Sequence, residues 1–318
     1  MSSTTNRFKS NHESDDRIAK LIAEYTGGAK AGPIAVKLSD LSRSDARALA
    51  SAWSRLSTTQ RRGLVRSMTD QAEANVELNF TRALQVAALD PDPEVRALAV
   101  GGLWEDESWA TAEILLGLFG SEREEAVREA IVIALGRYAY LSAMDELDDE
   151  RSALVRRVLL EASRPEEALS VQRRAIESVA YLADDPEVTR LISDAYAAPE
   201  RELRVSALFA MSRNLDRCWL STALQELGSD DPEFRFEAAK ACGEFGDERA
   251  VAPLLDLVDD EDREVQLAAI GAIGQIGGKT ATNVLRRLRQ SEDEVLRDAA
   301  DDALVHASYA TDPLRPIL

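Results

Sequence analysis

Few residues in this 318-residue sequence have the type and spacing that catalysis or metal binding requires. Its only histidines are His12 and His306, and its only cysteines, Cys218 and Cys242, form no Cys-x-x-Cys motif. A metal centre needs several imidazole, thiolate or carboxylate ligands at one site. Both cysteines fall at apolar positions of expected helices, which predicts buried thiols rather than nucleophiles. We therefore predict no catalytic residue, no metal site and no cofactor.

The glycine-rich segment at residues 271–278, Gly-Ala-Ile-Gly-Gln-Ile-Gly-Gly, superficially matches a phosphate-binding loop. A loop of that kind follows a strand and ends in Gly-Lys-Ser or Gly-Lys-Thr at a fixed spacing. No strand is expected before this segment, and the spacing is wrong. Close helix packing and a glycine at a helix C-terminus explain the segment better.

The charge balance argues against two classes of partner. The chain has 57 acidic and 38 basic residues, which gives a net charge of -19 at pH 7. A field of this sign repels the phosphates of nucleic acids and anionic lipid surfaces. The first twelve residues lack the apolar core of a secretion signal, and no apolar run is long enough to span a bilayer. We expect a cytoplasmic protein that binds neither nucleic acid nor membrane.

A short motif recurs along most of the chain and indicates the elements on which any site must rest. It has an apolar anchor residue near the start of each copy, and the spacing between anchors is 30–32 residues, with one interval of 44. Aromatic residues make up only 5% of the sequence, which favours helices over a β-sandwich or barrel. The seven anchors are Val95, Val127, Val171, Leu203, Phe234, Val265 and Val295.

Each copy of the motif predicts two antiparallel helices. In the copy that begins at Asp231, the Asp-Pro pair is typical of a helix N-terminus, because aspartate accepts from free N–H groups and proline has none to leave unpaired. Gly246 is expected to end this helix, and Asp247 to start a second one. Neither helix can bury its apolar stripe alone, so neighbouring copies must stack.

The repeated motif resembles the HEAT-repeat family, in particular the bacterial HEAT-like repeats named after phycobilisome lyases. The match rests on Asp-x-x-x-Val-Arg-x-x-Ala followed by Gly-x-x-Gly, as in Gly243-Glu-Phe-Gly246, and it covers roughly residues 90–308. The resemblance implies an all-α, right-handed α-solenoid of stacked HEAT-like helical hairpins. Deoxyhypusine hydroxylase, of the same type, binds two irons through His-Glu pairs. The His12-Glu13 pair lies outside the repeats, so that iron site is excluded.

The arginines that follow several anchors form a ladder one repeat apart, with a gap at Gln172: Arg96, Arg128, Arg204 and Arg235. Gln172, Gln266 and Leu296 replace the arginine after the other three anchors. They could form a row that binds anions. In HEAT-like families, however, this arginine usually pairs with an acid of the neighbouring repeat, and the resemblance implies the same here. We favour that structural role, with acids drawn from the set Asp90, Asp92, Glu122 and Asp231.

The sequence divides into three expected regions. Residues 1–40 are expected to be a polar, mobile segment with one short helix at about residues 16–25. Residues 41–90 carry helices without the repeat signature and are predicted to be an N-terminal helical cap. Residues 91–318 are predicted to be the solenoid of about seven repeats, in which the long interval extends a loop or a helix.

The face of the first helices is the strongest candidate for a binding surface, because it is more apolar than a solvated helix face should be. More than half of its apolar residues are expected to contact a neighbouring repeat. They are Val100, Trp104, Val132, Ile133, Val205, Leu208, Phe209, Phe236, Leu267 and Ile270. Aromatic and arginine residues are the usual anchors of protein interfaces. The candidate protein-binding residues are therefore Trp104, Arg137, Phe209, Arg213, Phe236 and Lys240.

These observations favour a non-catalytic scaffold or adaptor that binds another protein through the concave face of a HEAT-repeat solenoid. Its acidic turns would attract a partner with a basic surface. The alternative, implied by the family resemblance, is a lyase-type enzyme or accessory factor that acts on a tetrapyrrole-bearing protein.

Overall fold

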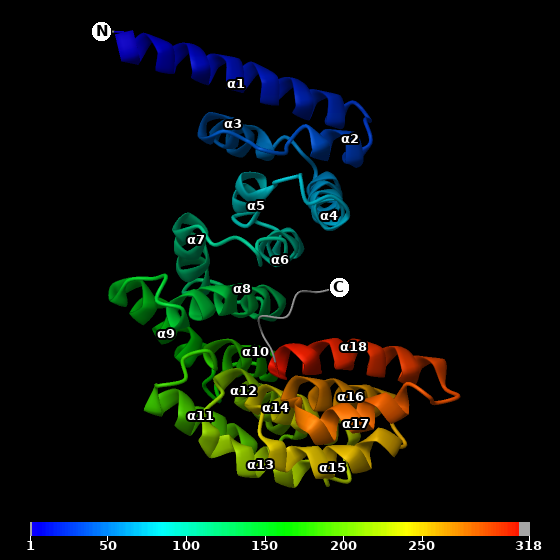
Figure 1. Ribbon diagram of the computed structural model, residues 1–318. Coiled ribbons are helices and arrows are strands. Elements are labelled where there is room, and N and C mark those ends of the chain that lie inside the picture. Colours follow the sequence, from blue (N-terminus) through cyan, green and yellow to red (C-terminus); the bar gives the residue numbers. More distant parts are fainter. Residues whose placement is uncertain (1, 312–318) are drawn as a thin grey trace. The chain divides into compact units, whose positions relative to one another are not determined.

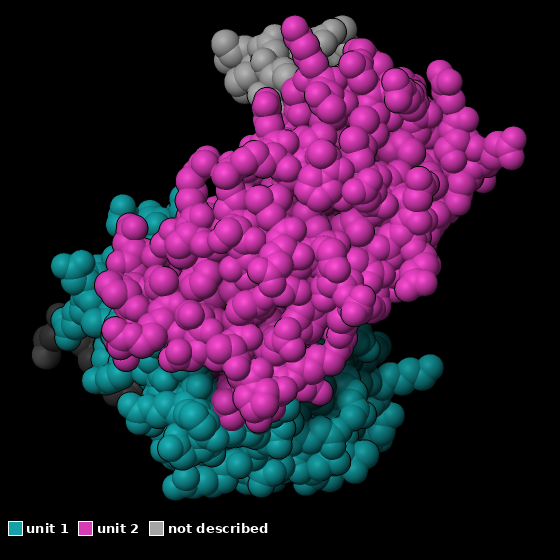
Figure 2. All heavy atoms as spheres, turned by 90° about the horizontal axis from the view of Figure 1, so that it is seen from below, with its two compact units in different colours: residues 1–171 teal, residues 172–318 magenta. Residues whose placement is uncertain are grey.

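The computed structural model describes the backbone of residues 2–311 and the side chains of residues 13–307. Every regular element in this part of the chain is helical, with eighteen α-helices, three short 3-10 helices and no strand (Figure 1). The predicted all-α class is therefore confirmed. The chain forms two compact units, residues 1–171 and residues 172–318, which are teal and magenta in Figure 2.

Unit 1 consists of two layers of helices. The even-numbered helices α2, α4, α6 and α8 pack in succession, and α1, α3 and α5 form a second row, with α7 packed against α9. Hairpin contacts such as α7 with α8 join the layers. Its helices are α1 (Ser2–Thr26), α2 (Ala31–Val36), α3 (Arg43–Trp53), α4 (Thr58–Ala74), α5 (Thr81–Ala87), α6 (Pro93–Gly101), α7 (Trp109–Phe119), α8 (Glu125–Ala143) and α9 (Asp149–Ala162).

Unit 2 repeats the same pattern: α12, α14, α16 and α18 stack side by side and each of α11, α13, α15 and α17 packs against one or more of them. The boundary between the units falls within α10 (Leu169–Val179). The other elements are α11 (Pro186–Tyr196), α12 (Arg201–Asn214), η1 (Arg217–Trp219), α13 (Leu220–Glu226), α14 (Pro232–Phe245), η2 (Glu248–Ala250), α15 (Val251–Asp256), η3 (Leu257–Asp259), α16 (Arg263–Ile276), α17 (Gly278–Leu288) and α18 (Glu294–Thr311).

The predicted helix signals of the repeat that begins at Asp231 are confirmed. The Asp231 side chain accepts from the N–H of Glu233, and Pro232 is the first residue of α14. Gly246 ends that helix with a left-handed φ of 62°, which costs glycine nothing. Asp247 then accepts from the N–H of Arg249 and starts the next turn of helix.

Glycines of the α14 and α16 helices let neighbouring helices approach closely, as we expected for the segment at residues 271–278. A Cβ on Gly274 would lie 2.7–2.8 Å from the backbone of Ala303 in α18. A Cβ on Gly243 would lie 2.9 Å from the Cα of Ala272 in α16. Both distances are too short for any side chain, so these glycines set the packing distance between the stacked helices.

The N-terminal segment differs from the expectation of one short helix after a mobile stretch. Helix α1 runs for 25 residues from Ser2 to Thr26, and α2 follows it, so residues 1–40 carry two helices. Ile18, Leu21 and Ile22 of α1 are buried, and α1 packs on α3. Once that apolar turn is anchored, each further helical residue adds a hydrogen bond without a new nucleation cost, which explains the longer helix.

The long interval between the second and third anchors is taken up by helices. Helix α8 has 19 residues, against 14 in each of α12, α14 and α16, and α9 adds another 14. The expected extension is therefore mainly helical, and Asp145, with a φ of 58°, lies in the turn between α8 and α9.

The seventh anchor was misassigned by one residue. Val295 is 49% exposed, whereas Leu296 packs against the core of unit 2. Leu296 is the third residue of α18, the position that Val265 holds in α16. With this correction the last interval becomes 31 residues, and Arg297 takes the ladder position that Leu296 was thought to occupy.

Candidate protein-binding surfaces

The arginine ladder is a structural feature, because its guanidinium groups are held by acids of the next repeat. Each ladder arginine is the fourth residue of its helix. Arg96 donates from Nε and Nη2 to the carboxylate of Glu122, at 2.7 and 3.0 Å. Arg235 makes the same bidentate contact with Asp260, at 2.7 and 2.8 Å. Arg128 pairs with Glu167 in the same way.

In four of the ladder repeats the remaining guanidinium nitrogen stabilises the turn before its own helix, namely in those of Arg96, Arg128, Arg235 and Arg297. Nη1 of Arg235 donates to the carbonyl of Ser229, six residues earlier, at 2.9 Å. Arg297 makes the same contact with Ser291, and Gln266 reproduces it with its side-chain amide on Asp260 at 2.7 Å. Glutamine can therefore replace arginine at this position without losing the contact to the turn.

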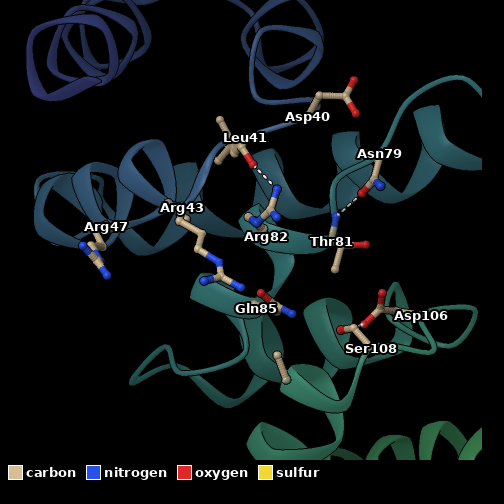
Figure 3. A pocket seen from close by; sticks show the side chains of 12 residues that line it. Asp40, Leu41, Arg43, Arg47, Asn79, Thr81, Arg82, Gln85, Asp106 and Ser108 are labelled. Carbon is tan, nitrogen blue, oxygen red and sulfur yellow. Dashed lines mark hydrogen bonds between the residues drawn. The ribbon is translucent and has the colours of Figure 1, made fainter. Parts of the chain in front are cut away.

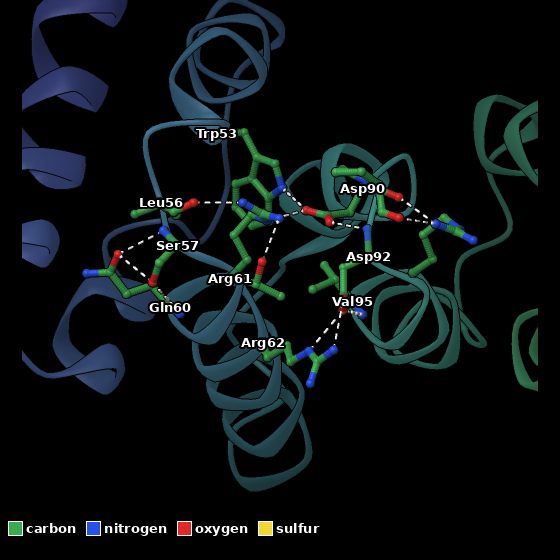
Figure 4. Close-up of polar contacts among 12 residues, drawn as sticks. Trp53, Leu56, Ser57, Gln60, Arg61, Arg62, Asp90, Asp92 and Val95 are labelled. Atoms are coloured by element: carbon green, nitrogen blue, oxygen red, sulfur yellow. Dashed lines mark hydrogen bonds and ion pairs between the residues drawn. The ribbon is translucent and has the colours of Figure 1, made fainter.

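Three of the four acids named as partners belong to other arginines. Glu122 holds a ladder arginine as expected, whereas Asp231 pairs with Arg201. Asp90 and Asp92 pair with Arg61 and Arg62 of α4 (Figure 4). Arg61 is also the fourth residue of its helix, so the ladder extends into the segment that lacks the repeat signature.

One rung of the ladder lacks an acid at the usual place. Ser229 lies three residues before the first residue of α14, at the position that Asp260 and Glu122 hold in their own repeats. Arg204, which would reach that place, instead lies over the ring of Phe234 at 4.7 Å from its centroid. Such a cation–π contact partly replaces an ion pair.

Four predicted site residues come together on the helices α12 and α14 of unit 2. The guanidinium of Arg213 lies 4.4 Å from the ring centroid of Phe209. The ammonium of Lys240 lies 5.2 Å from that ring and 5.1 Å from the ring of Phe236. We call this group, together with Tyr181 under Arg213 at 4.7 Å, the Phe209 cluster.

The cations of the Phe209 cluster cover its rings. Phe209 and Phe236 are half-buried, and Phe236 packs against the core of unit 2. Nη1 of Arg213 also donates to the backbone carbonyl of Glu177 at 2.9 Å, and burial lowers the pKa of this guanidinium. The two phenylalanines are therefore part of the inter-repeat packing, and a partner would meet the cations first.

A buried carboxylate, that of Glu237, lies next to the Phe209 cluster, and few groups stabilise its negative charge. Glu237 is 9% exposed, and its Oε2 accepts no hydrogen bond from any described residue. Lys240 lies 3.6 Å from that oxygen. Burial raises the pKa of Glu237, and Lys240 lowers it by a smaller amount.

The other predicted aromatic anchor, Trp104, lies in unit 1 and is open to solvent. It is 58% exposed and lines a groove of about 670 Å³ that runs over the faces of α4, α6 and α8. Ile133 and Val76 line the same groove and are 46% and 95% exposed. The groove is deep because small residues lie at positions where other helices have larger side chains: Ala97, Gly101, Ala126 and Ala130. We call this site the Trp104 groove.

Four carboxylates surround the apolar residues of the Trp104 groove: Glu73, Glu94, Glu105 and Glu129. Arg62 and Arg66 of α4 form ion pairs with Glu94. Of the exposed hydrophobic residues that line the groove, Trp104 and Ile133 were predicted from the sequence and Val76 was not. Val76 follows the end of α4, in a segment without the repeat motif, so the periodicity of the repeats could not predict that it is exposed in the groove.

Arg137 does not line the Trp104 groove. Its side chain pairs with Glu107 and lies over the ring of Tyr140, at 5.1 Å from the centroid. Five of the ten apolar residues predicted on the first-helix face are buried between helices: Val100, Val132, Val205, Leu208 and Ile270. We expected more than half of these residues to contact a neighbouring repeat, and half of them are buried.

The two cysteines differ, and one prediction was wrong. Cys242 is buried as predicted, and burial raises the pKa of its thiol to about 12. Cys218 is exposed, because it lies in the 3-10 turn η1 rather than on the apolar face of an α-helix. Partial burial and the neighbouring Asp216 raise the pKa of its thiol to about 11, so it is a weak nucleophile. No cluster of three metal-ligating side chains occurs among the described residues.

Comparison with known proteins assigns the chain to a family. The family model for HEAT repeats matches residues 81–164 and 220–305, which is more than half of the sequence. The chain therefore belongs to the HEAT-repeat family. A comparison with curated protein sequences finds no match.

Several solved structures resemble the fold. YibA from Escherichia coli is 15% identical, with a TM-score of 0.47, and the match covers 76% of this chain and 96% of YibA. Human deoxyhypusine hydroxylase in complex with glycerol is 16% identical, with a TM-score of 0.35 and coverage of 96% and 100%. A designed armadillo repeat protein in complex with the peptide (KR)4 is 15% identical, with a TM-score of 0.37 and coverage of 71% and 98%. None of the helices within residues 2–311 is long and apolar enough to span a membrane.

Proposed function

We propose that this HEAT-repeat protein is a non-catalytic scaffold that binds another protein through the Trp104 groove. The observation that carries the proposal is the gathering of three exposed apolar side chains, Val76, Trp104 and Ile133, in one hollow of the first-helix layer. Monomeric proteins rarely leave such a group open to water without a use for it. A tryptophan in a concave site is also a typical energetic centre of an interface.

The charges around the groove indicate the chemistry of the partner. Carboxylates of Glu73, Glu94, Glu105 and Glu129 rim an apolar floor, within a chain of net charge -19. An amphipathic helix with one apolar and one basic face complements this arrangement, because helices bind such grooves through residues spaced three and four apart. The proposed partner is therefore a protein that presents a basic amphipathic segment, in the cytoplasm.

Titration calorimetry with designed peptides tests this proposal. A helical peptide of leucine and lysine should bind the wild-type chain, and its leucine and glutamate counterpart should not. The double variant Trp104→Ser with Ile133→Ser should bind at least about tenfold more weakly. The matched control is Leu89→Ser, since Leu89 is 64% exposed and does not line the groove. Equal binding by the groove variant would contradict the proposal.

The Phe209 cluster is a second proposed contact surface, in unit 2. Its half-buried cations, Arg213 and Lys240, lie over the rings of Phe209 and Phe236. In unit 1, separately, Trp104 is the proposed aromatic contact and Arg137 of α8 the proposed polar contact.

A lyase-type accessory role is the alternative, and it follows from the narrower resemblance to phycobilisome-lyase repeats. Its support is the motif Asp-x-x-x-Val-Arg-x-x-Ala with Gly243-Glu-Phe-Gly246. Visible absorbance of the purified protein distinguishes the two functions. A co-purifying tetrapyrrole would support the lyase role, whereas the scaffold predicts a colourless protein.

A further inference from the structure

We propose that a second pocket of unit 1, lined by Arg43, Arg47 and Arg82, binds a phosphate monoester group. The pocket has a volume of about 540 Å³ and lies between α3, α5 and the start of α7 (Figure 3). Arg43 and Arg47 come from one face of α3, and Arg82 comes from α5. This site is distinct from the Trp104 groove, with which it shares no lining residue.

The surrounding charge differs from that of the rest of the chain. Residues 1–90 contain 13 basic and 10 acidic residues, a net charge of +3, whereas residues 91–318 contain 25 basic and 47 acidic residues, a net charge of -22. An anion that the whole molecule repels at long range can therefore still be attracted at short range near the pocket, because salt screens charges beyond about 8–10 Å.

The three arginines of the pocket have no acidic partner among the described residues. Arg61, Arg62, Arg66 and Arg96 of the same unit each form an ion pair. Arg43 and Arg47 form none, and Arg82 donates from Nη1 to the carbonyl of Leu41 at 2.5 Å. Three guanidinium groups that line one pocket without an acidic partner indicate a site for an anion.

Neutral donors complete the lining. In Figure 3 the guanidinium of Arg43 and the amide of Gln85 point toward one another across the pocket, with Thr81 beside them. Helix α7 begins at the lower wall, and its N-cap residue Ser108 does not cap the first-turn N–H groups with its side chain. The positive end of an eleven-residue helix therefore adds to the field of the arginines.

Two carboxylates in the wall limit what the pocket accepts. The Asp40 carboxylate accepts from the hydroxyl of Ser39 at 2.9 Å, and that of Asp106 accepts from the hydroxyl of Ser108 at 2.6 Å. Three guanidinium groups against two carboxylates leave a small positive excess, which suits one compact dianion better than an extended polyanion. A phosphate monoester has this charge, and its three terminal oxygens can accept from arginine forks and hydroxyl groups together.

The phosphate could belong to a small metabolite or to a phosphorylated side chain of a protein, and one titration series distinguishes these sources. The full-length chain is titrated at low salt with inorganic phosphate, with O-phospho-L-serine, and with a phosphoserine peptide and its unphosphorylated form. Saturable binding of the phosphorylated probes is expected. A peptide at least about tenfold tighter than free phosphoserine indicates a protein source, and equal affinity indicates a small molecule.

The double variant Arg43→Gln with Arg47→Gln should lose at least about tenfold in affinity for phosphoserine. Arg55→Gln is the matched control, because Arg55 is exposed and does not line the pocket. Protection of Arg43 and Arg47 from phenylglyoxal by phosphoserine, read by mass spectrometry on the wild-type chain, tests the site without any substitution. Absence of saturable binding, or binding without loss in the double variant and without protection, would overturn the proposal.

Discussion

The Trp104 groove of unit 1 and the Phe209 cluster of unit 2 both contain aromatic residues, yet they leave them in opposite states. Trp104 is open to solvent, whereas Phe209 and Phe236 lie beneath cations. The difference lies in the position of each residue relative to its helix. Phe209 and Phe236 lie inside α12 and α14, where Arg213 and Lys240 follow them four residues later on the same helix face, whereas Trp104 lies in the turn after α6 ends at Gly101. The rings inside the helices are covered by a cation one turn later on their own helix, whereas Trp104, beyond the end of its helix, has no such neighbour and is open to a partner.

The largest expected effect is a difference between the two sites in how much a substitution lowers the free energy of unfolding. Replacing both Phe209 and Phe236 by serine should lower the free energy of unfolding by about 3 kcal/mol, because half-buried rings are removed from the inter-repeat packing. Trp104→Ser should change the same quantity by less than about 0.5 kcal/mol, since it removes an exposed side chain. Denaturant unfolding of the two variants measures this difference. Equal stabilities would contradict the distinction between a covered and an open site.

The ladder of unit 2 offers a second, smaller effect that depends on pH. Arg235→Ala should destabilise the chain by about 1–3 kcal/mol at neutral pH, because the Asp260 carboxylate loses a buried bidentate contact. The hydrogen bonds from Arg235 lower the pKa of Asp260 from its ordinary value of 3.8. The stabilisation is therefore present above pH 3.8 and is lost as the pH falls through the lowered folded value. Thermal melting of Arg235→Ala across pH 3–7 measures it.

The matched control for that variant is Arg249→Ala. Arg249 also pairs with an aspartate, Asp247, but its side chain is 68% exposed. Exposed ion pairs contribute little to stability, so its melting temperature should stay close to that of the wild type. Equal losses from both substitutions would mean that burial does not determine the contribution of the ladder.

The buried carboxylate next to the Phe209 cluster predicts a gain in stability. Burial raises the pKa of Glu237, so the ionised form destabilises the folded chain above the ordinary value of 4.5, and protonation removes that cost at lower pH. Glu237→Gln should therefore raise the free energy of unfolding by about 1 kcal/mol at pH 7 and have little effect at pH 4. Denaturant unfolding at the two pH values measures it. A loss of stability at pH 7 would show that Lys240 fully compensates the charge.

The smallest expected effect is a change in the exposed apolar surface of the Phe209 cluster rather than in the free energy of unfolding. Arg213→Ala with Lys240→Ala should uncover the rings of Phe209 and Phe236 and increase the fluorescence of a bound hydrophobic dye. The corresponding control in unit 1, Arg137→Ala, should not, because Arg137 covers Tyr140 rather than Trp104. A dye signal that stays at the wild-type level in the double variant would show that the rings are shielded by other groups.

Local sequence signals predicted the helical hairpins well, because caps and apolar spacing act within a few residues. The start of α14 at Asp231-Pro232 and its end at Gly246 were predicted from residue types alone. The register of α18 was missed because Glu294-Val295 imitates Glu264-Val265, although the pair lies one position closer to the helix start. Alignment of Asp293 with the cap residue Asp262 would have found the correct register.

The candidate surfaces were harder to predict, because exposure depends on contacts between distant residues. Phe209 lies six residues after its anchor, inside α12, and Trp104 lies nine residues after its anchor, in the turn beyond α6. The spacing of the anchors alone does not show where α6 ends, and so does not show which of the two aromatic side chains is covered. Val76 was missed since it follows a helix that lacks the repeat signature. We predicted correctly that the ladder arginines pair with acidic residues, but not which acid each of them contacts. The pairs depend on the conformation of the turns between repeats, which the spacing of the anchors does not show.

The most direct test of the account is a quantitative capture experiment with three forms of the full-length chain. Wild type, the groove variant Trp104→Ser with Ile133→Ser, and the control Leu89→Ser are used to capture proteins from a lysate of the source organism, which mass spectrometry then quantifies. We predict a partner with a basic amphipathic segment that the wild type and Leu89→Ser capture equally and the groove variant loses. Equal capture of every bound protein by all three forms would contradict the claim that the Trp104 groove is the binding site.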